Sequence, residues 1–236
     1  MSNFVFRNRF WLIGAIFWIG FGLYTVDREN VVVALARALD PGASDAVLSR
    51  TVRIVFGVGA LAVILAAALR TWATAYLKTD VVHDRNLHSA TLVASGPYRH
   101  VRNPLYLGLL LMSFAFAMMA SRSGFVVIVL GIFAFQLALI LHEEHQLSQV
   151  HAENFLAYRR AVPRLIPSLT PRVSDAGTQP RWGQAFVGEA FMWIFAIAAV
   201  VWVLTLNMKY VGATALAGVI AHIVIIPVVR RRAVSE

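Results

Sequence analysis

The chain has 236 residues, of which 59% are hydrophobic and only 14% charged, and its mean hydropathy is +0.69. Soluble domains carry about 25% charged residues, so this composition is typical of a membrane protein. The absence of cysteine excludes disulfides, thiolate metal ligands and cysteine nucleophiles. The net charge of +9 comes from basic residues that flank apolar runs, which favours lipid headgroups and membrane topology over nucleic acid as its explanation.

The first apolar stretch follows Arg7 and Arg9, an arrangement that a signal peptide would share. The stretch runs from Phe10 to Val26 without a charge and contains several bulky aromatic residues. It ends at Asp27 with no pattern of small residues that would mark a cleavage site. We therefore interpret it as a retained first membrane span.

Six charge-free stretches are predicted to cross the membrane, since about 20 apolar residues span the hydrocarbon. They are Phe10–Val26, Ile54–Leu69, Leu105–Ala120, Ser123–Leu141, Ala190–Met208 and Tyr210–Val229. The second can extend to Leu77 if Arg70 snorkels, extending its charged group to the membrane interface. Pro104 is expected to begin the third helix, and the turn at Ser121–Gly124 to join the third and fourth spans as a hairpin. The fold class predicted is an all-α polytopic membrane bundle.

Shorter signals complete the organisation of the chain. Val31–Leu39 is expected to form a small helix on the outer surface, and Ser44 and Asp45 are the candidate caps for the helix of the second span. Residues 1–172 are predicted to form a core of four spans with a cytoplasmic helix. Residues 173–180 then form a polar linker, and residues 181–236 a two-span hairpin that resembles an appendage.

The distribution of basic residues predicts the orientation in the membrane. With six spans, 14 Lys and Arg residues lie on the side of the two termini and 6 lie on the opposite side. The positive-inside rule therefore predicts that both termini are cytoplasmic. The compact size and the lack of an ER retrieval signal favour a prokaryotic plasma (inner) membrane.

Two polar segments fall on this cytoplasmic side. The first, Lys78–Asn103, contains the first part of the turn-rich motif GPYRHVRNPLYLG, which spans residues 96–108. The second covers residues 141–167, where Glu143, Leu147, Val150, Asn154 and Tyr158 recur at three-to-four spacing and Pro163 ends the pattern. This spacing predicts a helix that continues out of the membrane from the fourth span.

Adjacent acids in the second segment suggest an ion pair with the first. Glu143 and Glu144 stand at the edge of the hydrocarbon, where a carboxylate is costly unless it is paired or hydrogen-bonded. Arg102 lies at the matching depth before the third span, and a hairpin makes the two helix ends neighbours. We therefore predict an Arg102–Glu143 or Arg102–Glu144 pair. His142 and His145 lack the spacing of zinc-binding helices, so no metal site is predicted.

These residues carry a resemblance to a known superfamily. GPYRHVRNPLYLG, followed by EEHQL and FLAYRRAVPRLIP, resembles the integral-membrane methyltransferases, which include the isoprenylcysteine carboxyl methyltransferases and the phospholipid N-methyltransferases. The family pattern is Gly-Pro-Tyr, Arg-His-Pro-x-Tyr-x-Gly, Glu-Glu-x-x-Leu, Tyr-x-x-Tyr-x-x-x-Val-Pro and a final Ile-Pro. The resemblance covers residues 90–168. Asn103 replaces the usual histidine and Phe155 replaces a tyrosine.

The resemblance implies S-adenosyl-L-methionine as cofactor, bound under the cytoplasmic segment in a pocket that opens sideways to the membrane. The residues it implies for cofactor binding are Gly96, Pro97, Tyr98, His100, Arg102, Asn103, Pro104, Tyr106, Glu143, Glu144, Tyr158, Leu165 and Ile166. Arg102 is expected to hold the carboxylate of the methyl donor, and Glu143 or Glu144 its amino group or ribose hydroxyls. Arg102 and Glu144 are the expected catalytic residues.

The expected function is S-adenosylmethionine-dependent methyl transfer to a lipophilic, membrane-embedded acceptor. The acceptor could be a prenylcysteine-type carboxylate, which needs no base, or a lipid headgroup amine. An amine must be neutral to attack, so Glu144 or His100 would accept its proton. Membrane lipids are the expected partners, and nucleic acid is not.

Two other classes of protein remain as alternatives. A membrane sterol reductase would use NADPH and carries a related Arg-His-x-Asn-Tyr-x-Gly motif, but the Gly-Pro-Tyr and Glu-Glu-x-x-Leu elements favour the methyltransferase. A non-enzymatic membrane scaffold or carrier is the other. Against a carrier, few polar residues besides Gln136 and His222 lie in the middle of the spans.

Overall fold

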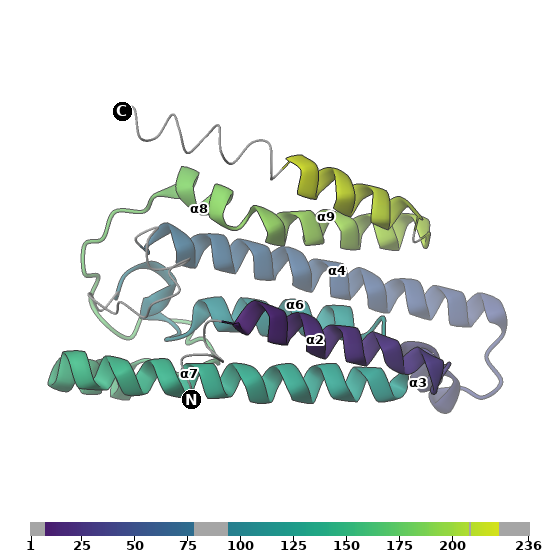
Figure 1. Ribbon diagram of the computed structural model, residues 1–236, viewed down its shortest axis with the longest axis horizontal. Coiled ribbons are helices and arrows are strands. Elements are labelled where there is room, and N and C mark those ends of the chain that lie inside the picture. The colour runs from purple at the N-terminus through teal and green to yellow at the C-terminus, as the bar shows by residue number, and fades with distance from the viewer. Residues whose placement is uncertain (1–7, 78–93, 208, 222–236) are drawn as a thin grey trace.

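The computed structural model describes residues 8–77, 94–207 and 209–221, and within these ranges all regular structure is helical. The long helices lie side by side along the long axis of the molecule (Figure 1). In chain order they are α2 (Arg9–Gly22), the 3₁₀ turn η1 (Leu23–Thr25), α3 (Val31–Leu39), α4 (Asp45–Ala75), the 3₁₀ turn η2 (Gly96–Arg99), α6 (Pro104–Ala117), α7 (Arg122–Ala161), α8 (Trp182–Gly188), α9 (Ala190–Thr205) and a last helix Lys209–Ala221. The predicted all-α class is confirmed.

Local capping signals fix where several helices begin. Ser44 caps α4 by accepting a hydrogen bond from the backbone N–H of Val47, as predicted. Asn30 does the same for α3 by accepting from two backbone N–H groups. Pro104 stands in the first turn of α6, where its missing N–H costs nothing, and this prediction is also confirmed.

Helix α7 joins the membrane part of the chain to the second polar segment. It begins after Ser121, whose hydroxyl accepts from Gly124, and continues without a break for 40 residues to Ala161. Val162 then turns the backbone into an extended conformation before Pro163. The predicted continuation of the fourth span as one helix that ends before Pro163 is thus confirmed, and its position outside the membrane stays a prediction.

The described helices contain fewer full-length spans than the sequence predicts. Helix α4 and the part of α7 from Arg122 to Val150 are long and apolar enough to cross a membrane, and α8 with α9, bent by 62°, could form a third span. Arg9–Thr25, α6 and Lys209–Ala221 are shorter apolar helices. A count of six spans therefore stays a prediction. His222, the rest of the sixth span and residues 78–93 lie outside the described part of the chain.

Small residues let the helices approach closely, as is usual in membrane bundles. A Cβ added to Gly124 of α7 would lie 2.2 Å from the carbonyl oxygen of Gly20 in α2, and one added to Gly20 would lie 2.3 Å from Ile128. Both glycines are therefore needed where α2 crosses α7.

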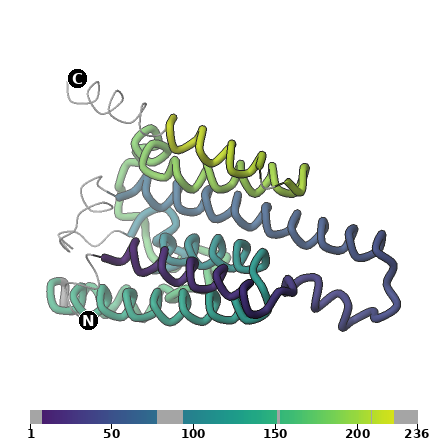
Figure 2. Tube along the Cα trace, turned by 45° about the vertical axis from the view of Figure 1, so that its right-hand side comes forward, coloured from purple at the N-terminus to yellow at the C-terminus, as the bar shows by residue number. Residues whose placement is uncertain are grey.

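An apolar core forms where α4, α6 and α9 meet. It contains Ala66 and Ala67 of α4, Met112 of α6, and Met192 and Ala196 of α9. Helix α9 runs along α4 for much of its length (Figure 2). Helix α9 thus shares a core with α4 and α6, and the division into a core, a linker and a hairpin stays a prediction.

Arg70 behaves differently from the sequence-based expectation. Its side chain is only 13% exposed and turns inward to Glu189, with Nε 2.7 Å from Oε2, instead of extending to the membrane interface. The carboxylate that draws it inward lies 119 residues away along the chain, so no local pattern could reveal it.

Candidate functional site

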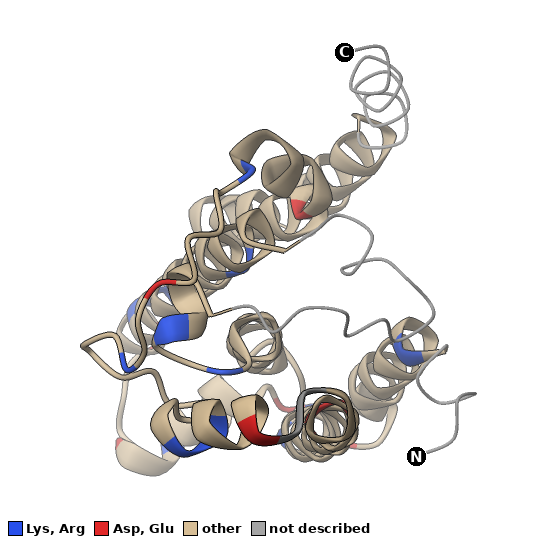
Figure 3. Ribbon diagram, turned by 90° about the vertical axis from the view of Figure 1, so that its left-hand side faces the viewer, with Lys and Arg blue, Asp and Glu red and all other residues tan. Residues whose placement is uncertain are grey.

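The two predicted polar segments meet at one end of the bundle. Residues 163–181, which we call the strap, leave α7 and run antiparallel along residues 94–102 before reaching α8 (Figures 1 and 3). Backbone N–H to carbonyl hydrogen bonds join Arg102 to Pro163, Ser168 to His100, Arg172 to Arg99, Ala176 to Ala94, and Arg181 to Ala75. The strap therefore closes over the motif turn and fixes it to the end of α7.

Glu144 is the centre of a buried charge cluster beneath the strap. Its side chain is 6% exposed, and its carboxylate lies 3.2 Å from Arg102 Nε and 2.8 Å from Arg164 Nη2. Asn103 Nδ2 donates to the same carboxylate at 3.3 Å. The predicted Arg102–Glu144 pair is confirmed. Two arginines against one glutamate leave this cluster one net positive charge.

Arg102 is fixed by two hydrogen bonds to carbonyl groups, but one of its side-chain donors has no hydrogen bond among the described residues. Its backbone N–H donates to Pro163 and its Nη1 donates to the carbonyl of Arg159. Its Nε is buried, and although it lies near Glu144 it lacks the alignment of a hydrogen bond to any described residue. Burial lowers the pKa of the Arg102 guanidinium, yet arginine stays charged near neutral pH. Buried donors without a hydrogen bond are rare in folded proteins, and a functional role is one explanation for such a group.

Glu143, one residue earlier on α7, faces a different neighbour. Its carboxylate accepts a hydrogen bond of 2.6 Å from the hydroxyl of Tyr106 in α6. The two adjacent acids therefore point to separate surroundings, because consecutive residues of a helix lie about 100° apart. Glu144 is neutralised by arginines, whereas Glu143 has a phenol as its hydrogen-bond partner.

Two buried tyrosines, one in the motif turn and one in α7, are in contact. Tyr98 and Tyr158 are both buried, and the hydroxyl of Tyr158 donates to the carbonyl of Tyr98 at 2.8 Å. Burial raises the pKa of both phenols above its ordinary value, so both are neutral donors. Phe155, which stands where the family has a tyrosine, packs on Tyr158 in the same cluster.

The two glycines of the motif are required by their neighbours. Gly96 has φ +56°, and a Cβ there would lie 2.4 Å from the ring of Tyr76. Gly108 lies against Arg70, because a Cβ there would lie 2.5 Å from Arg70 Cγ. Any side chain at these positions would push the motif away from α4.

His100 is oriented by the strap. Its Nδ1 lies 2.9 Å from the carbonyl oxygen of Ser168, and its ring packs against Trp72 with 6.2 Å between centroids. Because a carbonyl can only accept, Nδ1 carries the proton and Nε2 is left as an acceptor.

The structure brings most of the predicted site residues into this one region. Leu165 is half-buried, but the side chain of Ile166 is 83% exposed, and a contact between it and an adenine ring stays a prediction. Arg164 was not predicted as a site residue, although it makes the shortest contact to Glu144. Its place directly after Pro163, where the chain must turn back, is the signal that could have identified it.

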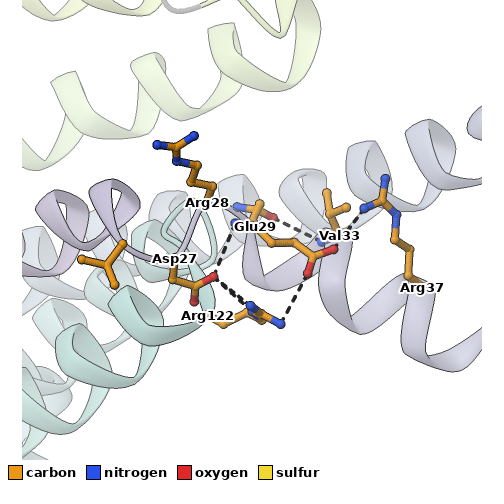
Figure 4. Close-up of a pocket in the computed structure, with 8 residues that line it drawn as sticks. Asp27, Arg28, Glu29, Val33, Arg37 and Arg122 are labelled. Atoms are coloured by element: carbon orange, nitrogen blue, oxygen red, sulfur yellow. Dashed lines mark hydrogen bonds and ion pairs between the residues drawn. The ribbon is translucent and has the colours of Figure 1, made fainter.

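A polar cavity of about 810 Å³ lies at the opposite end of the molecule and includes none of these residues (Figure 4). Arg122 lies 3.0 Å from Asp27 and 3.5 Å from Glu29, which also pairs with Arg37. The Ser123 N–H and Arg122 lower the pKa of Asp27 to about 2. These ion pairs join the turn after α2 to the start of α7, so we assign this cavity a structural role.

The fold and the site together define a membrane-embedded helical protein with a charged site at one end. Residues 53–154 match the family model described as phospholipid methyltransferase, which confirms the resemblance to the integral-membrane methyltransferase superfamily. The match indicates a membrane methyltransferase that acts on a lipid-related substrate. It covers the motif turn, Glu143 and Glu144, whereas the strap lies beyond it. No curated protein and no solved structure matches the chain.

Proposed function

We propose that the protein transfers a methyl group from S-adenosyl-L-methionine to a lipophilic acceptor embedded in the membrane. The observation that carries this proposal is the buried Arg102–Glu144–Arg164 cluster, which joins the motif turn, α7 and the strap. Such a cluster is costly next to a membrane unless it serves a ligand. Its position inside the strap-covered end of the bundle fits a small polar molecule.

The donor groups present match the polar groups of this cofactor. In the proposal Arg102, with its buried Nε and the net positive charge of the cluster, holds a carboxylate. Glu143 holds the amino group or ribose hydroxyls, since the oxygens of Glu144 already accept from Arg164 and Asn103. When bound, the cofactor supplies an electrophilic methyl group on a sulfonium. Tyr98, Tyr158 and the strap exclude water from the region in which the two substrates would align.

The acceptor decides whether a base is needed. A prenylcysteine-type carboxylate would attack without one, whereas a headgroup amine must first lose a proton. Of the two bases predicted from the sequence, Glu144 is occupied by two arginines and His100 presents Nε2 as an acceptor. We therefore propose that His100 accepts the proton if the acceptor is an amine. Glu144 then keeps Arg102 and Arg164 in place.

The proposed location follows from charge and from the cofactor. Among the described residues, most of the basic side chains lie at the site end of the bundle, which supports a cytoplasmic position under the positive-inside rule. The methyl donor is made in the cytosol, so a cytoplasmic site has direct access to it. We propose that both termini are cytoplasmic and that the membrane is the inner membrane of a prokaryote.

The test is a labelling experiment with purified protein in lipid nanodiscs. We would incubate wild type, Arg102→Ala, Glu144→Gln and the exposed control Glu153→Gln with methyl-labelled cofactor and a total lipid extract. We expect a labelled lipid species with wild type and Glu153→Gln and none with the other two variants, which should still insert in the membrane. Binding of NADPH without binding of the methyl donor would instead support the reductase alternative.

A further inference from the structure

Arg70 and Glu189 form a second buried charge network outside the motif. Arg70 Nε donates to Glu189 Oε2 at 2.7 Å and Nη2 donates to Oε1 at 3.0 Å, which is a bidentate contact. Thr74 adds a hydrogen bond of 2.8 Å to Oε1. The Glu189 side chain is 1% exposed and lies at the bend between α8 and α9. The network therefore connects the C-terminal helices to α4.

The third guanidinium nitrogen of Arg70 contacts a residue next to the candidate site. Arg70 Nη1 donates to the carbonyl of Leu105 at 3.0 Å. Leu105 stands in the first turn of α6, between Pro104 and Tyr106, whose hydroxyl contacts Glu143. Gly108 lies against the stem of the arginine, because a Cβ there would lie 2.5 Å from its Cγ. The motif glycine thus leaves room for a side chain that fixes the start of α6.

Stability alone is a weak reason for this arrangement. Replacing a buried ion pair by packed apolar residues is often neutral or stabilising, and α4, α6 and α9 already share an apolar core. A charged pair in a membrane bundle is instead typical of a functional position. The carbonyl that Arg70 reaches belongs to the first turn of α6, which also carries the motif residues Pro104 and Tyr106.

We propose that Arg70, held by Glu189, is a positioning residue that fixes the first turn of α6. It keeps Asn103 and Tyr106 at their places opposite Glu144 and Glu143. The C-terminal helices then belong to the catalytic unit, because they supply the carboxylate that orients the arginine. The inference rests on the proposed function for its kinetic test, but the contact to Leu105 can be tested without it.

Variants of this chain separate positioning from stability. Arg70→Lys keeps a charge for Glu189 but cannot make the bidentate contact and also reach Leu105. Arg70→Met/Glu189→Met removes both charges, so that no charge is left buried alone and the fold is retained. Trp193→Phe is the matched control. It removes a 3.0 Å hydrogen bond to Thr71 between the same helices, α9 and α4, and leaves the contact of Arg70 with Leu105 in place.

The experiment measures kcat, KM for the acceptor, the thermal midpoint and hydrogen exchange of residues 104–112. We expect kcat of the Arg70→Lys and double-methionine variants to fall on the order of 10- to 100-fold, since small displacements in a site have effects of this size. KM should change little, and exchange in residues 104–112 should rise. Trp193→Phe should lower the thermal midpoint and leave kcat and this exchange unchanged.

Two results would overturn the inference. One is unchanged kcat and unchanged exchange in residues 104–112 in both Arg70 variants. The other is a fall of kcat in Trp193→Phe that matches its loss of stability. If wild type transfers no methyl group at all, the proposed function fails, and the exchange of residues 104–112 still decides whether Arg70 fixes the start of α6.

Discussion

Replacing Glu144 by glutamine should destabilise the protein more than removing either arginine that contacts it. Removing one partner of a buried ion pair costs about 3–5 kcal/mol. Arg102 would remain with a 9% exposed side chain, but Arg164 is 32% exposed and can reach water, and glutamine still accepts a hydrogen bond. We therefore expect Glu144→Gln to lower the free energy of unfolding by about 3 kcal/mol, the lower end of this range. Arg164→Ala should cost less, because Glu144 keeps Arg102.

The free energy of unfolding is measured by reversible unfolding in mixed micelles. The double variant Glu144→Gln/Arg164→Ala completes a double-mutant cycle. Removing Glu144 and Arg164 together leaves one uncompensated charge instead of two. The double variant should therefore be more stable than the sum of the single losses predicts, by about 0.5–3 kcal/mol. Additive losses, or a Glu144→Gln variant as stable as wild type, would refute the view that one carboxylate balances both arginines.

Three further predictions concern other parts of the fold. Gly96→Ala should lower the free energy of unfolding by about 1–3 kcal/mol in the same unfolding experiment, since its φ of +56° and a neighbouring tyrosine ring leave no place for a Cβ. An unchanged unfolding midpoint would contradict this. Asp27, whose pKa is lowered from 3.8 to about 2 by the Ser123 N–H and Arg122, contributes stability above pH 3.8 that is lost as pH falls toward 2. An Asp27→Asn variant should show a weaker dependence on pH in this window, and an unchanged acid transition would count against the ion pair. Gln136 is fully buried in α7 without a hydrogen bond among the described residues, so Gln136→Met should be neutral or stabilising by about 1–2 kcal/mol, and a clear loss would reveal a hidden partner.

The sequence predicted the features of the fold that depend on neighbouring residues. Ser44 and Pro104 mark helix starts because capping and the missing proline N–H act within one turn. A pair between Arg102 and either Glu143 or Glu144 followed from one more step, since a tight hairpin makes the ends of two helices neighbours, and the structure selects Glu144. Burial of a carboxylate then demanded a cation, and the nearest one was Arg102.

Contacts between distant segments could not be predicted in this way. Glu189 and Arg70 are 119 residues apart, and neither stands in a pattern that marks it as buried. The sequence of the strap has neither a helical nor an alternating hydrophobic pattern. Its backbone forms hydrogen bonds with residues 94–102 instead of within the strap. Arg164 resembled an ordinary basic anchor until the strap placed it against Glu144. The reason is common to all three, since their conformations are set by the tertiary structure and not by local propensity.

The position of the strap also has a consequence for biosynthesis. The ribosome makes Arg102 first, Glu144 next and Arg164 last, so a nascent chain carries the acid and only one of its two cations for a time. The local charge is then balanced one to one, and it becomes positive only when residues 163–181 fold back over the turn. A chain truncated between Glu144 and Arg164 would therefore carry a neutral and uncovered site, and the site is completed by a segment made after the fourth hydrophobic stretch.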